Sequence, residues 1–73
     1  MKYAVIYKKT ATGYSAYVPD LPGCAGAAAT LEEAQQLMAQ AVEMHIAGMR
    51  SDGDPVPVPT TLTGYVAAGQ PAA

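Results

Sequence analysis

The sequence has few of the residues that carry metal or redox chemistry. It contains one cysteine, Cys24, and one histidine, His45. A lone cysteine excludes an intramolecular disulfide framework. One cysteine and one histidine are also too few ligands for a structural zinc site. We therefore expect no metal and no cofactor. A chain of 73 residues has a modest core, and no disulfide or metal site is available to stabilise it. Association with another subunit is therefore favoured.

Positive charge is also scarce. Lysine and arginine together number 4, and the net charge is −2. Nucleic-acid binding needs a cluster of cations to replace phosphate counterions, so this balance disfavours it and permits a basic protein partner. No apolar run reaches the roughly 20 residues of a membrane span. The first run is broken by Lys8 and Lys9 and is too short for a signal peptide, so we expect a cytoplasmic protein.

The carboxylates are too scattered for catalysis. Two-metal phosphodiester chemistry needs several of them to converge from the interior of a sheet. None falls in the middle of an expected strand, so capping or solvated roles are favoured for Asp20, Glu32, Glu33, Glu43, Asp52 and Asp54. His45 lacks an H-E-x-x-H partner, and nothing basic near Cys24 would lower its pKa. We expect no enzyme activity, a histidine at the edge of the core and a small buried cysteine.

The first third of the chain reads as three strands. Residues 2–9 alternate with apolar groups on both faces, and Gly13 can adopt the positive φ that closes a short hairpin. A second strand begins at Tyr14. Pro22 and Gly23 then fit the centre of a type II turn. Residues 24–28 follow as a short third strand, whose small side chains would let a helix approach the sheet closely.

One amphipathic helix follows. The sequence Thr30-Leu31-Glu32-Glu33 matches a capping box, in which the Thr30 hydroxyl accepts the N–H of Glu33 and the Glu33 carboxylate reaches back to the N–H of Thr30. Apolar residues at helical spacing make one stripe over about five turns. Gly53 offers a termination signal after the cation of Arg50. The stripe consists of Leu31, Ala34, Leu37, Met38, Ala41, Val42, His45 and Met49.

The segment after the helix alternates proline with valine. In an extended chain, Pro55, Pro57 and Pro59 remove every donor from one edge, so residues 55–59 are predicted to form a strand at a sheet edge. A solvated polyproline-II segment is the competing interpretation. We expect one domain over residues 1–60, and a tail over residues 61–73 that is loose or docks on a partner.

The tyrosines suggest a contact surface. If Tyr3, Tyr7 and Tyr17 share the sheet face away from the helix, they form either a base-stacking platform or a subunit interface, and the shortage of cations favours the interface. The candidate contacts to a partner or another subunit are Tyr3, Tyr7, Tyr17, Asp20, Leu21, Val56 and Val58.

Three motifs in order carry a family resemblance: GYSAYVPDLPGC at 13–24, TLEEA at 30–34 and DGDPVP at 52–57. Together they resemble the HicB-like antitoxin domain, over about residues 1–60. The resemblance implies an α+β fold of order β-β-β-α-β. This is a degenerate ribonuclease H-like domain with a three- to four-stranded sheet and one helix packed on one face.

The resemblance also implies a role in a bacterial type II toxin–antitoxin pair. The family's partner is a small basic HicA-like toxin that cleaves mRNA using a histidine, and the antitoxin domain covers that site without being a nuclease itself. Many members add a DNA-binding domain, but no DNA-reading helix fits after Thr60, so we expect no operator binding. We expect a homo-oligomer, dimer or tetramer. An orphan oligomer without a toxin and a nucleic-acid-binding or vestigial nuclease domain remain as alternatives.

Overall fold

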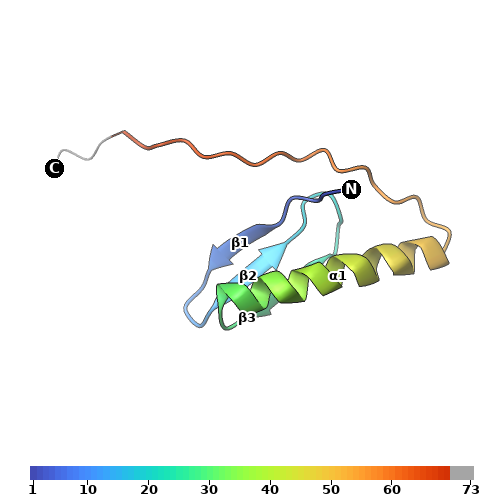
Figure 1. Ribbon diagram of the computed structural model, residues 1–73, viewed down its shortest axis with the longest axis horizontal. Coiled ribbons are helices and arrows are strands. Elements are labelled where there is room, and N and C mark those ends of the chain that lie inside the picture. The colour runs from blue at the N-terminus through green and yellow to red at the C-terminus, as the bar shows by residue number, and fades with distance from the viewer. Residues whose placement is uncertain (70–73) are drawn as a thin grey trace.

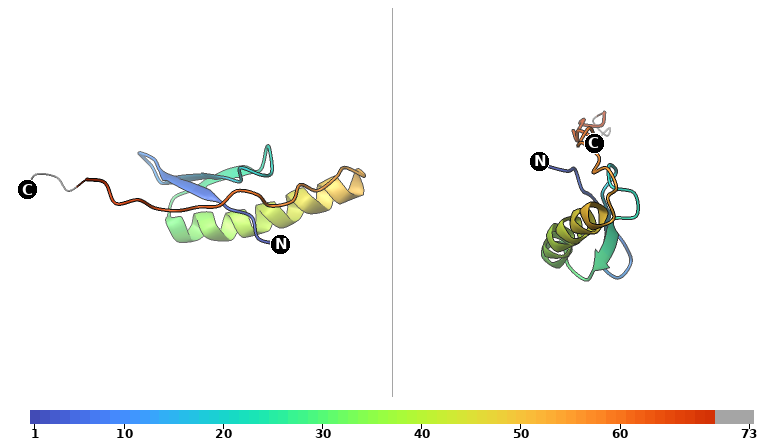
Figure 2. Two further views of the ribbon diagram at one scale, coloured as in Figure 1. Left: turned by 90° about the horizontal axis from the view of Figure 1, so that it is seen from above. Right: turned by 90° about the vertical axis from the view of Figure 1, so that its right-hand side faces the viewer.

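A computed structural model describes residues 1–69, and the last four residues of the predicted tail lie outside this range. Three strands, β1 (Ile6–Lys9), β2 (Tyr14–Tyr17) and β3 (Ala25–Ala28), form an antiparallel sheet of order β1-β2-β3. One helix, α1 (Leu31–Ser51), packs across one face of that sheet (Figures 1 and 2). The α+β class with a three-stranded sheet and a single covering helix is confirmed.

The strand register decides which side chains face the helix. Ala16 is 4% exposed and lies opposite Tyr7 on β1 and Gly26 on β3, so these positions share the helix-facing side. Side chains of the next residues point to the opposite face, because direction alternates along a strand. Ile6 and Tyr17, which lie opposite each other, are therefore on the uncovered face.

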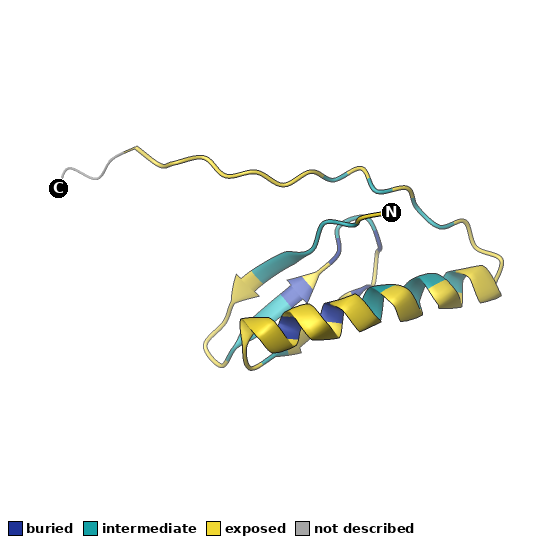
Figure 3. Cartoon of the chain, in the orientation of Figure 1, coloured by how far each residue is buried: buried dark blue, intermediate teal, exposed yellow. Residues whose placement is uncertain are grey.

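The core lies between the sheet and α1, which packs chiefly against β3 and secondly against β2. A Cβ atom added at Gly26 would come within 2.9 Å of Leu37 Cδ2, so the absence of a side chain lets the helix settle close to β3. This confirms the expected close approach. The buried apolar residues are Ala16, Val18, Leu21, Cys24, Ala34 and Met38 (dark blue in Figure 3).

The turn before β3 has the predicted geometry. Gly23 has φ of +85°, and the N–H of Cys24 donates to the carbonyl of Leu21 at 3.0 Å, which together make a type II turn with Pro22 at its first central position. The N–H of Val18 also donates to the Cys24 carbonyl at 3.0 Å. This bond extends the β2–β3 pairing by one position.

The prediction for Gly13 is wrong in its mechanism. Within residues 1–69 a positive φ occurs only at Gly23 and Gly53. Gly13 is required for another reason, since a Cβ there would overlap the carbonyl oxygen of Ala28 and lie 2.8 Å from the Cα of Ala29. The hairpin between β1 and β2 therefore packs directly on the backbone that leaves β3.

Both ends of α1 are capped. The Thr30 hydroxyl oxygen accepts the N–H of Glu33 at 3.1 Å, as predicted, but the Glu33 carboxylate accepts from that hydroxyl, at 3.0 Å, rather than from the N–H of Thr30. At the other end Gly53 has φ of +75° and its N–H donates to the Arg50 carbonyl at 3.1 Å. The N–H of Asp54 reaches the Met49 carbonyl at 2.8 Å, completing a Schellman motif.

The fourth strand predicted at residues 55–59 is not formed, because no described residue after α1 is in a strand. The segment runs extended and passes beside the N-terminal segment, where the Tyr3 hydroxyl donates to the Pro57 carbonyl (Figure 1). Alternating prolines leave too few donors for a ladder. No helix among residues 1–69 is long and apolar enough to cross a membrane.

Asp20 fixes the path of the chain beyond the prolines. Its Oδ2 accepts the N–H groups of Thr60 and Thr61, each at 2.9 Å, and its Oδ1 accepts their hydroxyls at 3.3 and 2.7 Å. These four hydrogen bonds favour the ionised carboxyl and lower the pKa of Asp20 to about 2, with the bonds from Thr61 contributing most. We call this arrangement the Asp20 clasp.

The close packing at Gly13 gives the first prediction. Gly13→Ala forces backbone atoms apart, and we expect it to destabilise the domain by about 1–3 kcal/mol. Gly48→Ala is the matched control, because a Cβ at this helix position meets no atom within 4 Å and should stabilise by about 0.5–1 kcal/mol. Urea unfolding followed by circular dichroism measures both. Equal stability of the two variants would contradict the packing of the hairpin on β3.

The Asp20 clasp gives the second prediction. The folded pKa lies below the ordinary value of 3.8, so the clasp stabilises the fold above that value and is lost as pH falls through about 2. Thr61→Val removes a hydroxyl donor and should raise the pKa of Asp20 towards 3.8, as followed by the carboxyl carbon resonance. Thr63→Val, at a residue that makes no hydrogen bond to Asp20, should leave the pKa unchanged. An unchanged pKa in Thr61→Val would refute the clasp.

Candidate functional site

The chemical groups that could support catalysis are held apart or already engaged. No cluster of three or more metal-ligating side chains occurs within residues 1–69. Asp20 is engaged in the clasp and Glu33 in the helix cap. Burial raises the pKa of the Cys24 thiol, so Cys24 is held in the protonated form that is a poor nucleophile.

The predicted contact residues do not form one surface. Tyr3 and Tyr7 pack against the core on the helix-facing side, whereas Tyr17, 46% exposed, lies on the opposite face. The shared tyrosine face is therefore wrong. Leu21 is 0% exposed and so is absent from the surface, while Val58 is 70% exposed.

Val56 is half-buried beside Pro57, whose carbonyl is bound by Tyr3. Asp20 is partly covered, and its two carboxylate oxygens already accept hydrogen bonds from Thr60 and Thr61. Among the predicted contacts, Tyr17 and Val58 remain the two whose side chains are largely open to solvent.

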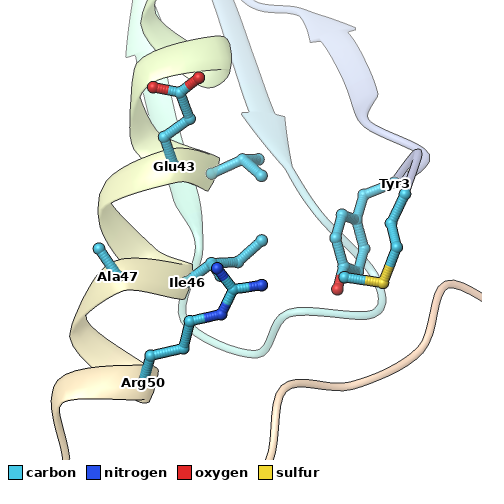
Figure 4. A pocket seen from close by; sticks show the side chains of 7 residues that line it. Tyr3, Glu43, Ile46, Ala47 and Arg50 are labelled. Atoms are coloured by element: carbon cyan, nitrogen blue, oxygen red, sulfur yellow. The ribbon is translucent and has the colours of Figure 1, made fainter.

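A groove runs between α1 and the N-terminal segment. Because α1 packs chiefly over β3 and β2, the helix-facing side of the segment before β1 is left open. One part of the groove, about 340 Å³, lies between Tyr3 and the helix residues Val42 and Ile46 (Figure 4). A second part, about 360 Å³, shares Tyr3 and Val42 with the first and continues past Val5 and Tyr7 to Met38. We call the two parts together the β1-side groove.

The rim of this groove carries both signs of charge. Glu43 and Arg50 lie seven residues apart on α1, and the Arg50 side chain extends towards Tyr3 in Figure 4. The walls are apolar and partly exposed, formed by Tyr3 on one side and by Val42 and Ile46 on the other. An apolar interior with a charged rim is the usual anatomy of a protein-binding patch.

Sequence reasoning missed this groove because it assigned Val42 to the core stripe and did not single out Ile46. Both residues are at the periphery of the packed face, where exposure depends on how far the helix is displaced across the sheet. The spacing of apolar residues shows which side of a helix is apolar, but it does not show how far the helix is displaced across the sheet. That displacement is set by packing at Gly26. Tyr3 carried a signal, since it was predicted as a contact.

A second groove lies on the other flank of α1, next to the outer edge of β3. It measures about 360 Å³ and is lined by Gly23, Cys24, Ala25, Ala41, Met44 and His45. Met44 is 74% exposed. His45 is half-buried there, near the type II turn, as expected for a histidine at the edge of the core.

The fold is similar to that of a solved HicA3 and HicB3 toxin–antitoxin complex. A chain of that complex shares 30% sequence identity with this one at a TM-score of 0.70, over 81% of this chain and 69% of that one. An uncharacterised 14.9 kDa protein from the rep-hol intergenic region of Haemophilus phage HP1 is 36% identical over 66 residues. The match covers 90% of this chain, which spans 50% of the length of the phage protein.

The family comparison covers nearly the whole chain. Residues 3–71 match the model of the HicB-like antitoxin of bacterial toxin–antitoxin systems. The match includes the strands, the Asp20 turn, the capped helix and the proline segment. The chain therefore belongs to the HicB-like antitoxin family.

Proposed function

We propose that this domain neutralises a small, basic, mRNA-cleaving toxin by binding over its active site, and that it has no enzyme activity of its own. The observation that carries the proposal is the fold shared with a chain of the HicA3 and HicB3 complex, at 30% identity and a TM-score of 0.70. The net charge of −2 suits a basic partner.

The β1-side groove is the proposed toxin-binding site. It offers partly exposed apolar side chains from two elements, Tyr3 on one wall and Val42 and Ile46 on the other. Anchors of this kind supply most of the affinity in protein complexes. Glu43 at the rim provides a charge that a basic surface would meet favourably, while Arg50 limits the groove at its other end.

An orphan oligomer without a toxin is the second candidate. A chain of 73 residues with one cysteine has no internal disulfide, so association between copies would stabilise its small core without a toxin. Co-expression with the product of an adjacent small basic reading frame separates the two. Co-purification supports the antitoxin, whereas failure to bind any adjacent basic product supports the orphan.

The charge at the groove rim gives the third prediction. Glu43→Lys places a cation opposite a basic toxin and should weaken toxin binding at least tenfold, about 1.4 kcal/mol, with a stronger effect at low salt. Gln36→Lys is the matched control, since it adds the same charge at an exposed helix position that does not line the groove. Surface plasmon resonance with the co-expressed toxin measures both.

Equal weakening by the two lysines would mean that net charge, and not the groove, governs binding. Ile46→Asp provides a second variant that buries a charge in the proposed contact, with its fold checked by circular dichroism. Cleavage of RNA by the purified domain with magnesium, abolished in Asp20→Ala, would refute the non-enzymatic assignment.

A further inference from the structure

The outer edge of β3 lacks charge, proline and cover, three of the features that protect a sheet edge. Within residues 1–69, no segment pairs with it. Its sequence, AGAA, contains no lysine, proline or other bulky group. The opposite edge, at β1, carries Lys8 and Lys9 and has the chain after the clasp running beside it. Natural proteins use charge, proline or cover to block edge pairing, and β3 has none of these.

The hydrogen-bond phase of β3 shows which groups are free. The bond from the N–H of Val18 to the Cys24 carbonyl makes these two residues a hydrogen-bonded pair. Antiparallel pairs alternate, so Gly26 and Ala28 direct their backbone groups towards β2. Ala25 and Ala27 therefore direct their N–H and C=O groups outward from the sheet, and both residues are exposed.

We propose that β3 pairs antiparallel with β3 of a second copy of this chain, about a two-fold axis at Gly26. In this register Ala25 of one copy exchanges both backbone hydrogen bonds with Ala27 of the other, and the symmetry repeats the exchange on the other side of the axis. The outward positions are thus self-complementary. The two sheets join into one of six antiparallel strands.

The helices add an apolar contact above the joined strands. Leu37 approaches Gly26 and is 38% exposed, so the axis brings two Leu37 side chains together. Met44 lines the groove beside Ala25 and is 74% exposed, so it gains cover from the second copy. Because α1 packs chiefly against β3, the two copies of α1 lie side by side across the axis.

The lack of charge favours a second copy over a basic partner at this edge. Residues 21–29 contain no ionisable acid or base other than the buried Cys24. Two copies, each with a net charge of −2, therefore pair along the β3 edge itself without like charges in contact there. A basic toxin would find no carboxylate on β3. The dimer is independent of the toxin-binding proposal, which uses the opposite flank of α1.

Sedimentation velocity of the full chain between micromolar and millimolar concentration tests the dimer. We expect a species of about twice the 7.5 kDa monomer mass. Ala27→Pro removes one outward donor without touching the β2–β3 ladder and should raise the dimer dissociation constant at least tenfold. Ala27→Ser keeps the donor and should leave the constant within twofold.

Leu37→Glu is the second variant and should weaken the dimer at least as much, because it places two carboxylates at the axis. Ala39→Glu adds the same charge on the other flank of α1 and should have no effect. Circular dichroism establishes that each variant is folded. A monomeric wild-type chain at millimolar concentration would overturn the proposal, as would a dimer insensitive to both variants. So would a monomer whose toxin capture is lost in Ala27→Pro, since β3 would then be the toxin site.

Discussion

The close approach of α1 to β3 is the constraint on which the rest of the structure depends. Gly26 leaves room for Leu37, and a Cβ at this position would also lie 3.4 Å from the sulfur of Met38. The small side chains of β3 therefore determine where the helix axis lies over the sheet. With α1 displaced towards β3, the N-terminal segment is left partly uncovered, and one side of α1 faces a bare sheet edge. Both candidate binding surfaces follow from this displacement.

Features specified by neighbouring residues could be predicted from the sequence. The type II turn needs proline followed by glycine, and the helix start needs a side-chain oxygen at Thr30. The conformations at Gly23 and Thr30 could therefore be predicted from the neighbouring residues alone. Features that depend on distant partners could not. Gly13 and the proline segment were assigned by local rules, but the backbone leaving β3 and the Asp20 clasp decide their conformations.

The same distinction between local and distant determinants explains which parts of the candidate site could be predicted. Alternation along β2 alone puts the Tyr17 side chain on the other face of the sheet from Ala16, but grouping Tyr7 with Tyr17 required the register between two strands. That register reverses the grouping, because Tyr7 lies opposite the buried Ala16. Asp20 was predicted as a contact, and nothing in the neighbouring sequence indicated that its carboxylate would accept hydrogen bonds from two threonines forty residues later. Functional surfaces here depend on tertiary packing.

The two proposed surfaces can be used together, because they lie on opposite flanks of one helix. Pairing through β3 covers the sheet edge near Ala25 and Met44. Tyr3, Val42 and Ile46 lie on the other flank of α1 and stay accessible. A two-fold axis at Gly26 directs the two β1-side grooves away from each other. Self-association of this kind would stabilise a small core and leave the toxin-binding capacity of each copy intact.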